Sequence, residues 1–249
     1  MKRVVLITGV SGGIGSATAK VFFEAEWHVV GIDFSEVKGL EWVHHFIRGD
    51  LTDEAVSGRV FAEVADVEGR IDALINNAAV QICKPLVDTT PQEWDQVMAT
   101  NVRAVYLAVR HAYPLMRDQE SAIVNVSSVH ALATSANIAA YAASKGALLS
   151  MTRALAIELA PDKIRVNTVL PGAVDTPMLD AGLSQRNPKG ENLDQLKKQI
   201  AIRHIVGRVG RPEEIAQAIF FLSDARMSSF VTGQTLVADG GALAKLSTE

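Results

Sequence analysis

The sequence has almost no cysteine, and it begins without a long apolar segment. Cys83 is the one cysteine among 249 residues, so the chain cannot form an intrachain disulfide, which is typical of proteins from a reducing compartment. The start, Met-Lys-Arg followed by four apolar residues, is too short for the apolar region of a signal peptide. We therefore expect a cytoplasmic protein.

Long apolar runs and blocks of like charge are also missing. No apolar run approaches the length that spans a membrane, and with a formal net charge of −4 no block of five like charges occurs. These absences argue against nucleic acid or a membrane surface as a partner. A small soluble molecule is the better expectation, and nothing in the motifs below calls for a metal.

What the chain does have is a regular alternation of short apolar runs and helical patterns. Strands are expected at residues 4–7, 28–33, 46–51, 73–75, 122–127, 164–170 and, with its closing turn, 235–241. Helices are expected at residues 14–25, 53–67 (capped by Thr52), 91–116, from Tyr141 to about Leu159, and 212–222. This alternation predicts an α/β protein: over residues 1–249, a single-domain doubly wound Rossmann fold with a seven-stranded parallel sheet. Residues 177–211 are polar and irregular, and we interpret them as a substrate lobe or lid.

A glycine-rich turn follows the first strand. Gly9, Gly13 and Gly15 separate that strand from a helix, and another strand follows the helix. Glycine lets the backbone approach a pyrophosphate, and a helix N-terminus offers free N–H groups. In this βαβ context the turn predicts a dinucleotide site and not merely a surface turn.

Asp33 ends the second strand, about twenty residues beyond the glycines. A carboxylate there can accept both hydroxyls of an adenosine ribose and would repel a 2′-phosphate. The turn carries Ser11 and no basic residue, and Lys38, the nearest cation, is interpreted as a solvated loop residue. The pattern favours NAD over NADP.

Tyr141 and Lys145 are spaced to stand one helical turn apart on one face, and Ser128 follows the strand at 122–127. A free tyrosine titrates near ~10, and a neighbouring ammonium would lower that pKa. The three side chains could surround a carbonyl or alcohol oxygen. Taken alone, however, a Tyr-x-x-x-Lys pair is more often a solvated pair on a helix.

Other polar positions have two readings each. Asp50 could contact adenine or cap a strand end, and Asn76 and Asn77 could line a cleft or bond neighbouring backbone. Asn101 falls inside a predicted helix, where a polar amide is ordinarily a solvated surface residue.

Together these segments resemble the short-chain dehydrogenase/reductase family over essentially the whole chain. The motifs that carry the resemblance are Thr8-Gly9-x-x-x-Gly13-x-Gly15, Asn76-Asn77-Ala78, Asn101, Ser128, Tyr141, Lys145 and Pro171-Gly172. Departures occur at Ala79, Ala104 and Ala131, where family members often have glycine. We expect them to affect the shape of the pocket and not its chemistry, since alanine costs little where φ is negative.

The resemblance implies roles for individual residues. Tyr141 would be the general acid/base, Ser128 would donate to the substrate oxygen, and Lys145 would bond the nicotinamide ribose. Asn101 would hold a water in a proton relay. Residues implied to contact NAD are Gly9, Ser11, Gly13, Ile14, Gly15, Asp33, Asp50, Leu51, Asn77, Ala78, Tyr141, Lys145, Pro171, Gly172, Val174 and Thr176. The family also implies a homotetramer with two-fold symmetry.

Candidate substrate contacts are Gln81, His130 and Leu179. Gln81 and His130 are similar to carboxylate-binding residues of 3-hydroxybutyrate dehydrogenases in this family, but Ile138 stands where those enzymes have a lysine. We therefore expect NAD-dependent oxidation of a sugar or polyol first, of a 3-hydroxy acid second, and reduction of a 3-oxoacyl thioester third. A catalytically silent dinucleotide-binding sensor is the alternative from another class, and the intact catalytic set argues against it.

Overall fold

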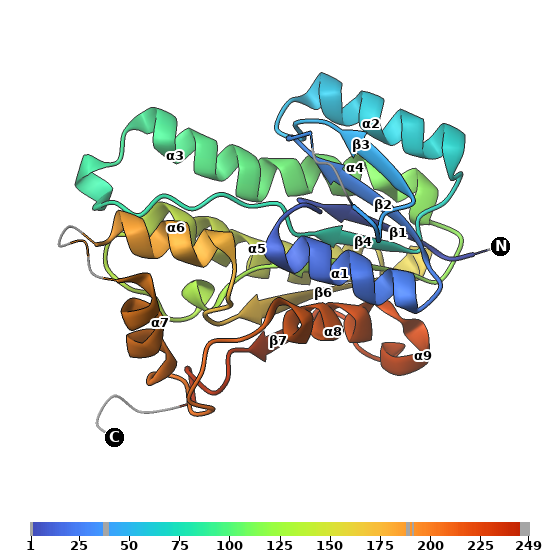
Figure 1. Cartoon of the computed structure of the whole chain (residues 1–249). Coiled ribbons are helices and arrows are strands. Elements are labelled where there is room, and N and C mark those ends of the chain that lie inside the picture. Colours follow the sequence, from blue (N-terminus) through green and yellow to red (C-terminus); the bar gives the residue numbers. More distant parts are fainter. Residues whose placement is uncertain (1, 37–39, 188–189, 191, 245–249) are drawn as a thin grey trace.

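A parallel sheet of seven strands forms the centre of the structure (Figure 1). The computed structural model describes residues 2–36, 40–187, 190 and 192–244. The strands lie in the order β3-β2-β1-β4-β5-β6-β7. They are β1 (Val4–Thr8), β2 (His28–Asp33), β3 (His45–Arg48), β4 (Ala73–Asn76), β5 (Ser121–Val126), β6 (Ile164–Pro171) and β7 (Thr235–Ala238). All neighbours pair in parallel, which confirms the predicted doubly wound Rossmann fold.

Helices cover both faces of the sheet, as β-branched strands that are buried on both sides require. On one face pack α2 (Glu54–Val67), α4 (Ala104–Met116) and α5 (Ala139–Glu158). On the other face pack α1 (Gly13–Glu24) and α8 (Pro212–Ser223), which also contact each other. Short elements complete the chain: η1 (Leu86–Asp88), η3 (Val129–Ala131), η4 (Ala160–Asp162) and α9 (Ala225–Ser228).

Two predictions fail where the chain leaves β3. The strand stops at Arg48 and does not continue to residue 51, and Asp53, not Thr52, caps α2 by accepting from the Val56 N–H at 3.0 Å. The Thr52 hydroxyl is already used, because it donates to the Asp50 carboxylate at 2.8 Å. Asp50 therefore turns the chain out of the sheet before the helix begins.

The helix that starts at Pro91 ends at Met116, as predicted, but is less regular than its pattern indicates. A capping box between Thr90 and Glu93 opens α3 (Pro91–Met98), as expected. The chain then forms a π-helical segment, η2 (Ala99–Arg103), before α4 continues to Met116. Such segments insert one extra residue into a helix and often lie at functional sites. Asn101 is inside this one.

Residues 177–211 are more regular than predicted. They contain α6 (Pro177–Gln185) and α7 (Leu193–Ala201), capped by the side chains of Thr176 and Asn192. Lys197 of α7 contacts carboxylate oxygens of Asp175 and Asp180 at 2.7 Å each, which ties α7 to the start of α6. Within this stretch, residues 188, 189 and 191 lie outside the described residues. Both helices lie beyond the carboxyl ends of the strands (Figure 1).

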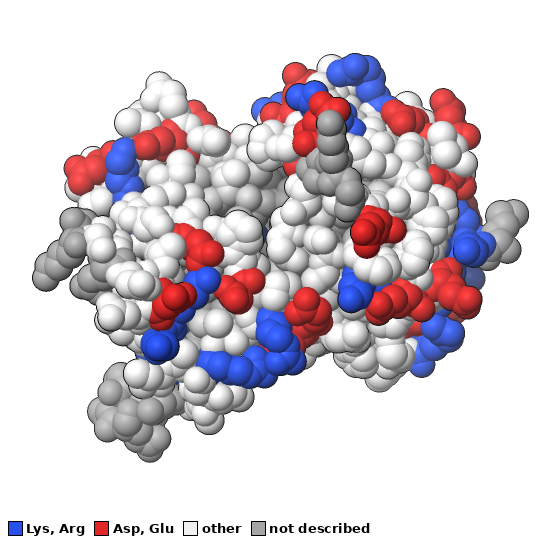
Figure 2. All heavy atoms as spheres, in the orientation of Figure 1, with Lys and Arg blue, Asp and Glu red and all other residues white. Residues whose placement is uncertain are grey.

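The visible surface mixes charges of both signs (Figure 2). Lysine and arginine side chains lie beside aspartate and glutamate side chains, and the surface is hollowed between the part that carries α6 and the part that carries α1. Within the described residues, no helix combines the length and apolarity that crossing a membrane requires.

Candidate active site

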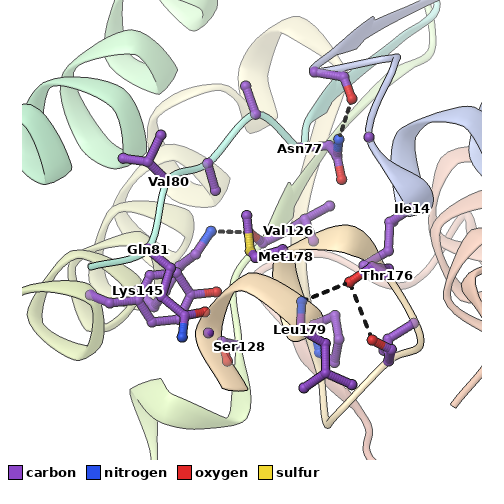
Figure 3. Close-up of a pocket in the computed structure, with 18 of the residues that line it drawn as sticks. Ile14, Asn77, Val80, Gln81, Val126, Ser128, Lys145, Thr176, Met178 and Leu179 are labelled. Atoms are coloured by element: carbon purple, nitrogen blue, oxygen red, sulfur yellow. Dashed lines mark hydrogen bonds between the residues drawn. The ribbon is translucent and has the colours of Figure 1, made fainter. Parts of the chain in front are cut away.

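A cleft of about 750 Å³ lies at the carboxyl ends of the strands. It opens where β1 neighbours β4, the point at which the strand order reverses and ligands bind in folds of this kind. Residues from distant parts of the chain meet there (Figure 3). The predicted dinucleotide contacts that line it are Gly9, Ser11, Gly13, Ile14, Asp33, Asp50, Leu51, Asn77, Ala78, Tyr141, Lys145, Pro171, Gly172, Val174 and Thr176.

The glycine turn leaves a cradle that side chains would fill. Gly9 has a φ of +64°, and a Cβ there would lie 2.8 Å from the Cα of Ala78. A Cβ on Gly13 would lie 2.7 Å from the Thr176 methyl carbon. No side chain caps the N-terminus of α1 at Gly12, and its first turn holds no acidic residue. Its free N–H groups therefore suit the pyrophosphate of a dinucleotide.

Gly15 is a correction to the predicted contacts, because it does not line the cleft. A Cβ at this position would lie 2.2 Å from the carbonyl oxygen of Gly9. Glycine is needed here so that α1 can pack against its own preceding turn, and not for contact with a ligand.

Asp33 faces the same end of the cleft and is only 6% exposed. The backbone N–H of Ser11 donates to one carboxylate oxygen at 3.2 Å, the Ser11 hydroxyl donates to that oxygen too, and the Ser35 N–H donates to the other at 3.2 Å. The glycine turn thus holds the carboxylate where ribose hydroxyls would lie. No lysine or arginine of the described chain lines this end; Lys38 lies outside the described residues.

Asn77 and Asp50 each line the cleft and also accept or donate hydrogen bonds within the protein. The Asn77 amide donates to the carbonyl oxygens of Thr8 and Gly9 at 3.0 Å each, and the residue also lines the cleft (Figure 3). Asp50 lines the cleft while accepting from Thr52. Asn76, by contrast, is buried and donates to the Asn125 side chain at 2.8 Å.

Ser128, Tyr141 and Lys145 meet at the opposite end of the cleft. They are 7%, 6% and 2% exposed, so the solvated reading of the Tyr-x-x-x-Lys pair is wrong. The Lys145 ammonium lies 5.5 Å from the centre of the Tyr141 ring and donates to the Val126 carbonyl at 2.8 Å. The Ser128 oxygen accepts from the His130 N–H at 3.2 Å, so the hydroxyl proton is available to Tyr141 or to a substrate oxygen.

Burial dominates the titration of this pair. It raises the pKa of Tyr141 to about 12, a hydrogen bond with Ser128 opposes that rise, and the nearby Cys83 adds to it. Burial lowers the pKa of Lys145 to about 7. The expected lowering of the Tyr141 pKa by Lys145 is therefore not the leading effect, because desolvation acts on both side chains.

Asn101 is fully buried and does not line the cleft, so its interpretation as a solvated surface residue is wrong. Its side-chain oxygen accepts from the Val80 N–H at 2.8 Å, and its nitrogen donates to the Val80 carbonyl and the Ser144 hydroxyl at 2.9 Å each. Ser144 in turn donates to the carbonyl of Tyr141 at 2.7 Å. These bonds hold the backbone at Val80, in the cleft wall, against α5.

The three alanines at family glycine positions fit without strain. Ala79, Ala104 and Ala131 are absent from the residues with positive φ, so their Cβ atoms meet no backbone penalty. Ala79 and Ala104 line the cleft. At these two positions alanine forms part of the cleft wall, whereas Ala131 is not among the lining residues.

All three candidate substrate contacts, Gln81, His130 and Leu179, line the cleft. The His130 ring lies edge-on to the Tyr141 ring at 6.0 Å between centroids. Burial lowers the pKa of His130, and Arg186 lowers it further. Arg186 and Arg203 also line the cleft. The sequence analysis missed both; the one signal was that they fall in the predicted lobe.

The known proteins that are similar to this chain include dehydrogenases and reductases. Residues 9–242 match a family model described as enoyl-(acyl carrier protein) reductase. Cyclopentanol dehydrogenase of Comamonas sp. is 38% identical over 96% of this chain and 96% of its own. Aldohexose dehydrogenase of Thermoplasma acidophilum has a TM-score of 0.91 at 29% identity, covering 99% of this chain and 96% of that one. The 3-ketoacyl-(acyl-carrier-protein) reductase of Brucella melitensis, solved with NADH, has a TM-score of 0.87 at 32% identity, covering 96% and 98%.

We predict that Lys145→Met stabilises the protein at neutral and acidic pH and that this gain shrinks as pH rises. The pKa of Lys145 is about 7 when folded, against 10.5 in a free lysine, so the unfolded chain binds more protons between these values. Wild-type stability therefore rises with pH across that window, at about 1.4 kcal/mol per pH unit for one proton. The variant lacks this dependence.

Melting temperatures measured calorimetrically from about pH 6 to about pH 10 give the result. Lys198→Met, which removes an exposed lysine of α7, is the matched control: it retains Lys145 and should therefore keep the pH dependence of the wild type. A wild-type minus Lys145→Met difference that stays constant over the range contradicts the prediction.

Proposed function

Because the chain belongs to the short-chain dehydrogenase/reductase family, we propose that it is a NAD-dependent dehydrogenase that interconverts a secondary alcohol and its ketone. The observation that carries the proposal is the convergence of Ser128, Tyr141 and Lys145 in a cleft whose other end holds Asp33. Hydroxyl, phenol and ammonium groups within one buried site suit proton transfer to and from an alcohol oxygen. Bound NAD would supply the hydride acceptor.

The protein's own part is to hold the substrate oxygen and move its proton. Ser128 donates a hydrogen bond to that oxygen, since the His130 N–H already occupies the other side of its hydroxyl. Tyr141 takes the alcohol proton, and its high pKa means that it needs a cationic neighbour to do so as a phenolate. Protonated Lys145, 5.5 Å from its ring, is that neighbour. Asn101 keeps α5 in place through Ser144.

NAD is preferred over NADP because the buried Asp33 carboxylate would repel a 2′-phosphate. The related reductase solved with NADH supports the same cofactor class. Because NAD is mostly oxidised in cells, the direction that we propose is alcohol oxidation, in the cytoplasm.

The substrate that we propose is small and polar, as a sugar or polyol is. Related proteins are named for aldohexose and for cyclopentanol. Residues 177–211 would form the substrate lobe, since Met178, Leu179 and Leu183 of α6 line the cleft opposite Gln81. A 3-hydroxy acid and a 3-oxoacyl thioester are the alternatives for the same chemistry.

A homotetramer is also proposed, and two groups among the exposed large apolar side chains support it. In the first, Tyr106 of α4 and Leu132, just before α5, are 48% and 57% exposed. The second group is Phe221 of α8, Met227 of α9, Phe230 in the turn after α9 and Val237 of β7, with Phe230 fully exposed. Contacts with two copies would cover both patches.

We predict that Tyr141→Phe lowers the rate of NADH formation at least about 100-fold, the contribution expected of a general acid/base. The wild type, Tyr141→Phe and the control Tyr106→Phe are compared on a panel of sugars, polyols, 3-hydroxy acids and secondary alcohols. Tyr106 lies on the surface of α4, so its variant keeps wild-type activity. Unchanged activity in Tyr141→Phe would show that the catalytic assignment is wrong.

Measurements of NADH binding distinguish an enzyme from a catalytically silent sensor. Fluorescence titration with NADH should give the same affinity for Tyr141→Phe and for the wild type, because the change removes one hydroxyl from the substrate end. NADH binding without turnover on any member of the panel would favour the sensor.

We predict that Asp33→Ala narrows the preference for NAD over NADP by at least about tenfold, since removing the carboxylate removes its repulsion of a 2′-phosphate. Asp33→Asn is the matched variant: it removes the charge and keeps an oxygen that accepts from Ser11. Both variants should move the ratio of kcat/KM values in the same direction. An unchanged ratio would mean that Asp33 does not read the ribose.

We predict that light scattering at micromolar concentration gives a mass four times that of the chain and that Phe230→Glu lowers it. A charge in the middle of an apolar contact costs several kcal/mol when it is buried without a partner. Val67→Glu, which alters an exposed valine at the end of α2 outside both patches, is the control. A monomeric wild-type protein would exclude the tetramer.

A further inference from the structure

Arg186 is a cation at the substrate end of the cleft that the reaction described above does not use. It follows α6 directly, is exposed and lines the cleft. Its guanidinium is close enough to His130 to help lower the pKa of that imidazole. No ion pair to Arg186 forms within the part of the chain that the structure describes.

Two contacts hold the end of α6 against the wall of the cleft that carries Gln81 and Cys83. Gly182 packs so closely on Gln81 that a Cβ would lie 2.8 Å from the Gln81 amide nitrogen. Three residues later, the Gln185 side-chain oxygen accepts from the Cys83 N–H at 3.0 Å. These contacts fix the position from which Arg186 reaches the cleft, on the same side as Gln81. Figure 3 shows Gln81 at the end of the cleft that holds Ser128 and Lys145.

Tyr141, His130 and Arg186 line the same cleft. The centroids of the Tyr141 and His130 rings are 6.0 Å apart, and the charge of Arg186 acts on His130, whose pKa it helps to lower. His130 Nδ1 lies 3.0 Å from the Thr134 hydroxyl. If that nitrogen accepts the hydroxyl proton, Nε2 of the neutral ring carries its hydrogen and can donate to a ligand. When a substrate oxygen lies between Ser128 and Tyr141, another group of the same substrate, a few bonds away, can meet two donors, His130 and Arg186.

Charge is distributed unequally along the cleft. Within the described residues, its acidic lining residues are Asp33 and Asp50, both at the dinucleotide end. The lobe contributes Arg186 and Arg203 and no carboxylate to the lining. Arg186 and Arg203 therefore attract anions to this end of the cleft, where no carboxylate of the described lining offsets their charge.

We propose that the substrate is a secondary alcohol that also carries an oxyanion, a carboxylate or a phosphate, bound by Arg186 with His130 and Gln81. A guanidinium fork matches either anion with two parallel hydrogen bonds. Ile138, the apolar residue before α5, is 1% exposed and does not line the cleft, so the cation comes from α6 instead. The proposal rests on the proposed dehydrogenase and narrows its sugar or polyol to an acidic one, or to a hydroxy acid.

Matched substrate pairs test it by steady-state kinetics with NAD. The pairs are gluconate with sorbitol, 3-hydroxybutyrate with 3-hydroxybutyramide, and glycerol 3-phosphate with glycerol; the last pair distinguishes phosphate from carboxylate. Arg186→Gln should raise KM for the anionic member at least about tenfold, at nearly constant kcat, and change the neutral member less than about twofold. Arg186→Lys should recover part of the loss, because a point charge remains.

The control is Lys198→Gln, which removes the same charge from an exposed position of α7 outside the cleft lining. It should leave both members of each pair unchanged. Equal effects of Arg186→Gln on the anionic and neutral members, or no effect on either, would overturn the proposal.

Calorimetry tests the anion site separately from the proposed dehydrogenase activity. Each anion is titrated into NADH-loaded wild type and into Arg186→Gln. Binding that is lost in the variant supports the site, even if no alcohol is turned over and the proposed function fails. Binding that is equal in both proteins, or no binding of any of these anions to the wild type, overturns it while leaving Tyr141-dependent turnover to decide the function.

Discussion

The buried amide of Asn101 joins the two walls of the cleft, and the rest of the site depends on it. It bonds both polar groups of the Val80 backbone and, through Ser144, the carbonyl of Tyr141. Burying an amide is costly unless every bond is made, so these contacts favour one arrangement of wall and helix. Asn101 makes these bonds from within the π-helical segment, where it is the buried residue.

The same dry surroundings set the chemistry beside it. Lys145 and Tyr141 are both withdrawn from water, so each is displaced toward its neutral form, and the carbonyl of Val126 is the nearest partner of the ammonium. A site of this kind is sensitive to any charge that enters it, since little solvent screens the interaction. The Ser128 hydroxyl can donate a hydrogen bond to an oxygen that carries such a charge.

Much of this architecture could be predicted from the sequence, and the failures have physical causes. The buried strands and the glycine turn are local patterns, so the sheet was predicted correctly, with Asp33 and Ser128 at its strand ends. The π-helical segment was missed because it depends on Val80 and Ser144, which are distant in sequence. The helix α7 was missed because its apolar residues, Leu193, Leu196 and Ile200, form only a narrow stripe in a polar segment, and none of its residues is fully buried. Arg186 became visible only when α6 was placed beside His130.

Stability and selectivity reside in different parts of this molecule. The dinucleotide end is made from strand ends and tight glycine contacts, where almost any change disturbs the sheet. In residues 177–211, by contrast, no residue of α7 is fully buried, and Gly182 is the only fully buried residue of α6. Substitutions on these two helices can therefore accumulate with little penalty to folding. Such a lobe is a natural starting point for libraries that diversify what the protein accepts, and for the divergence of its descendants.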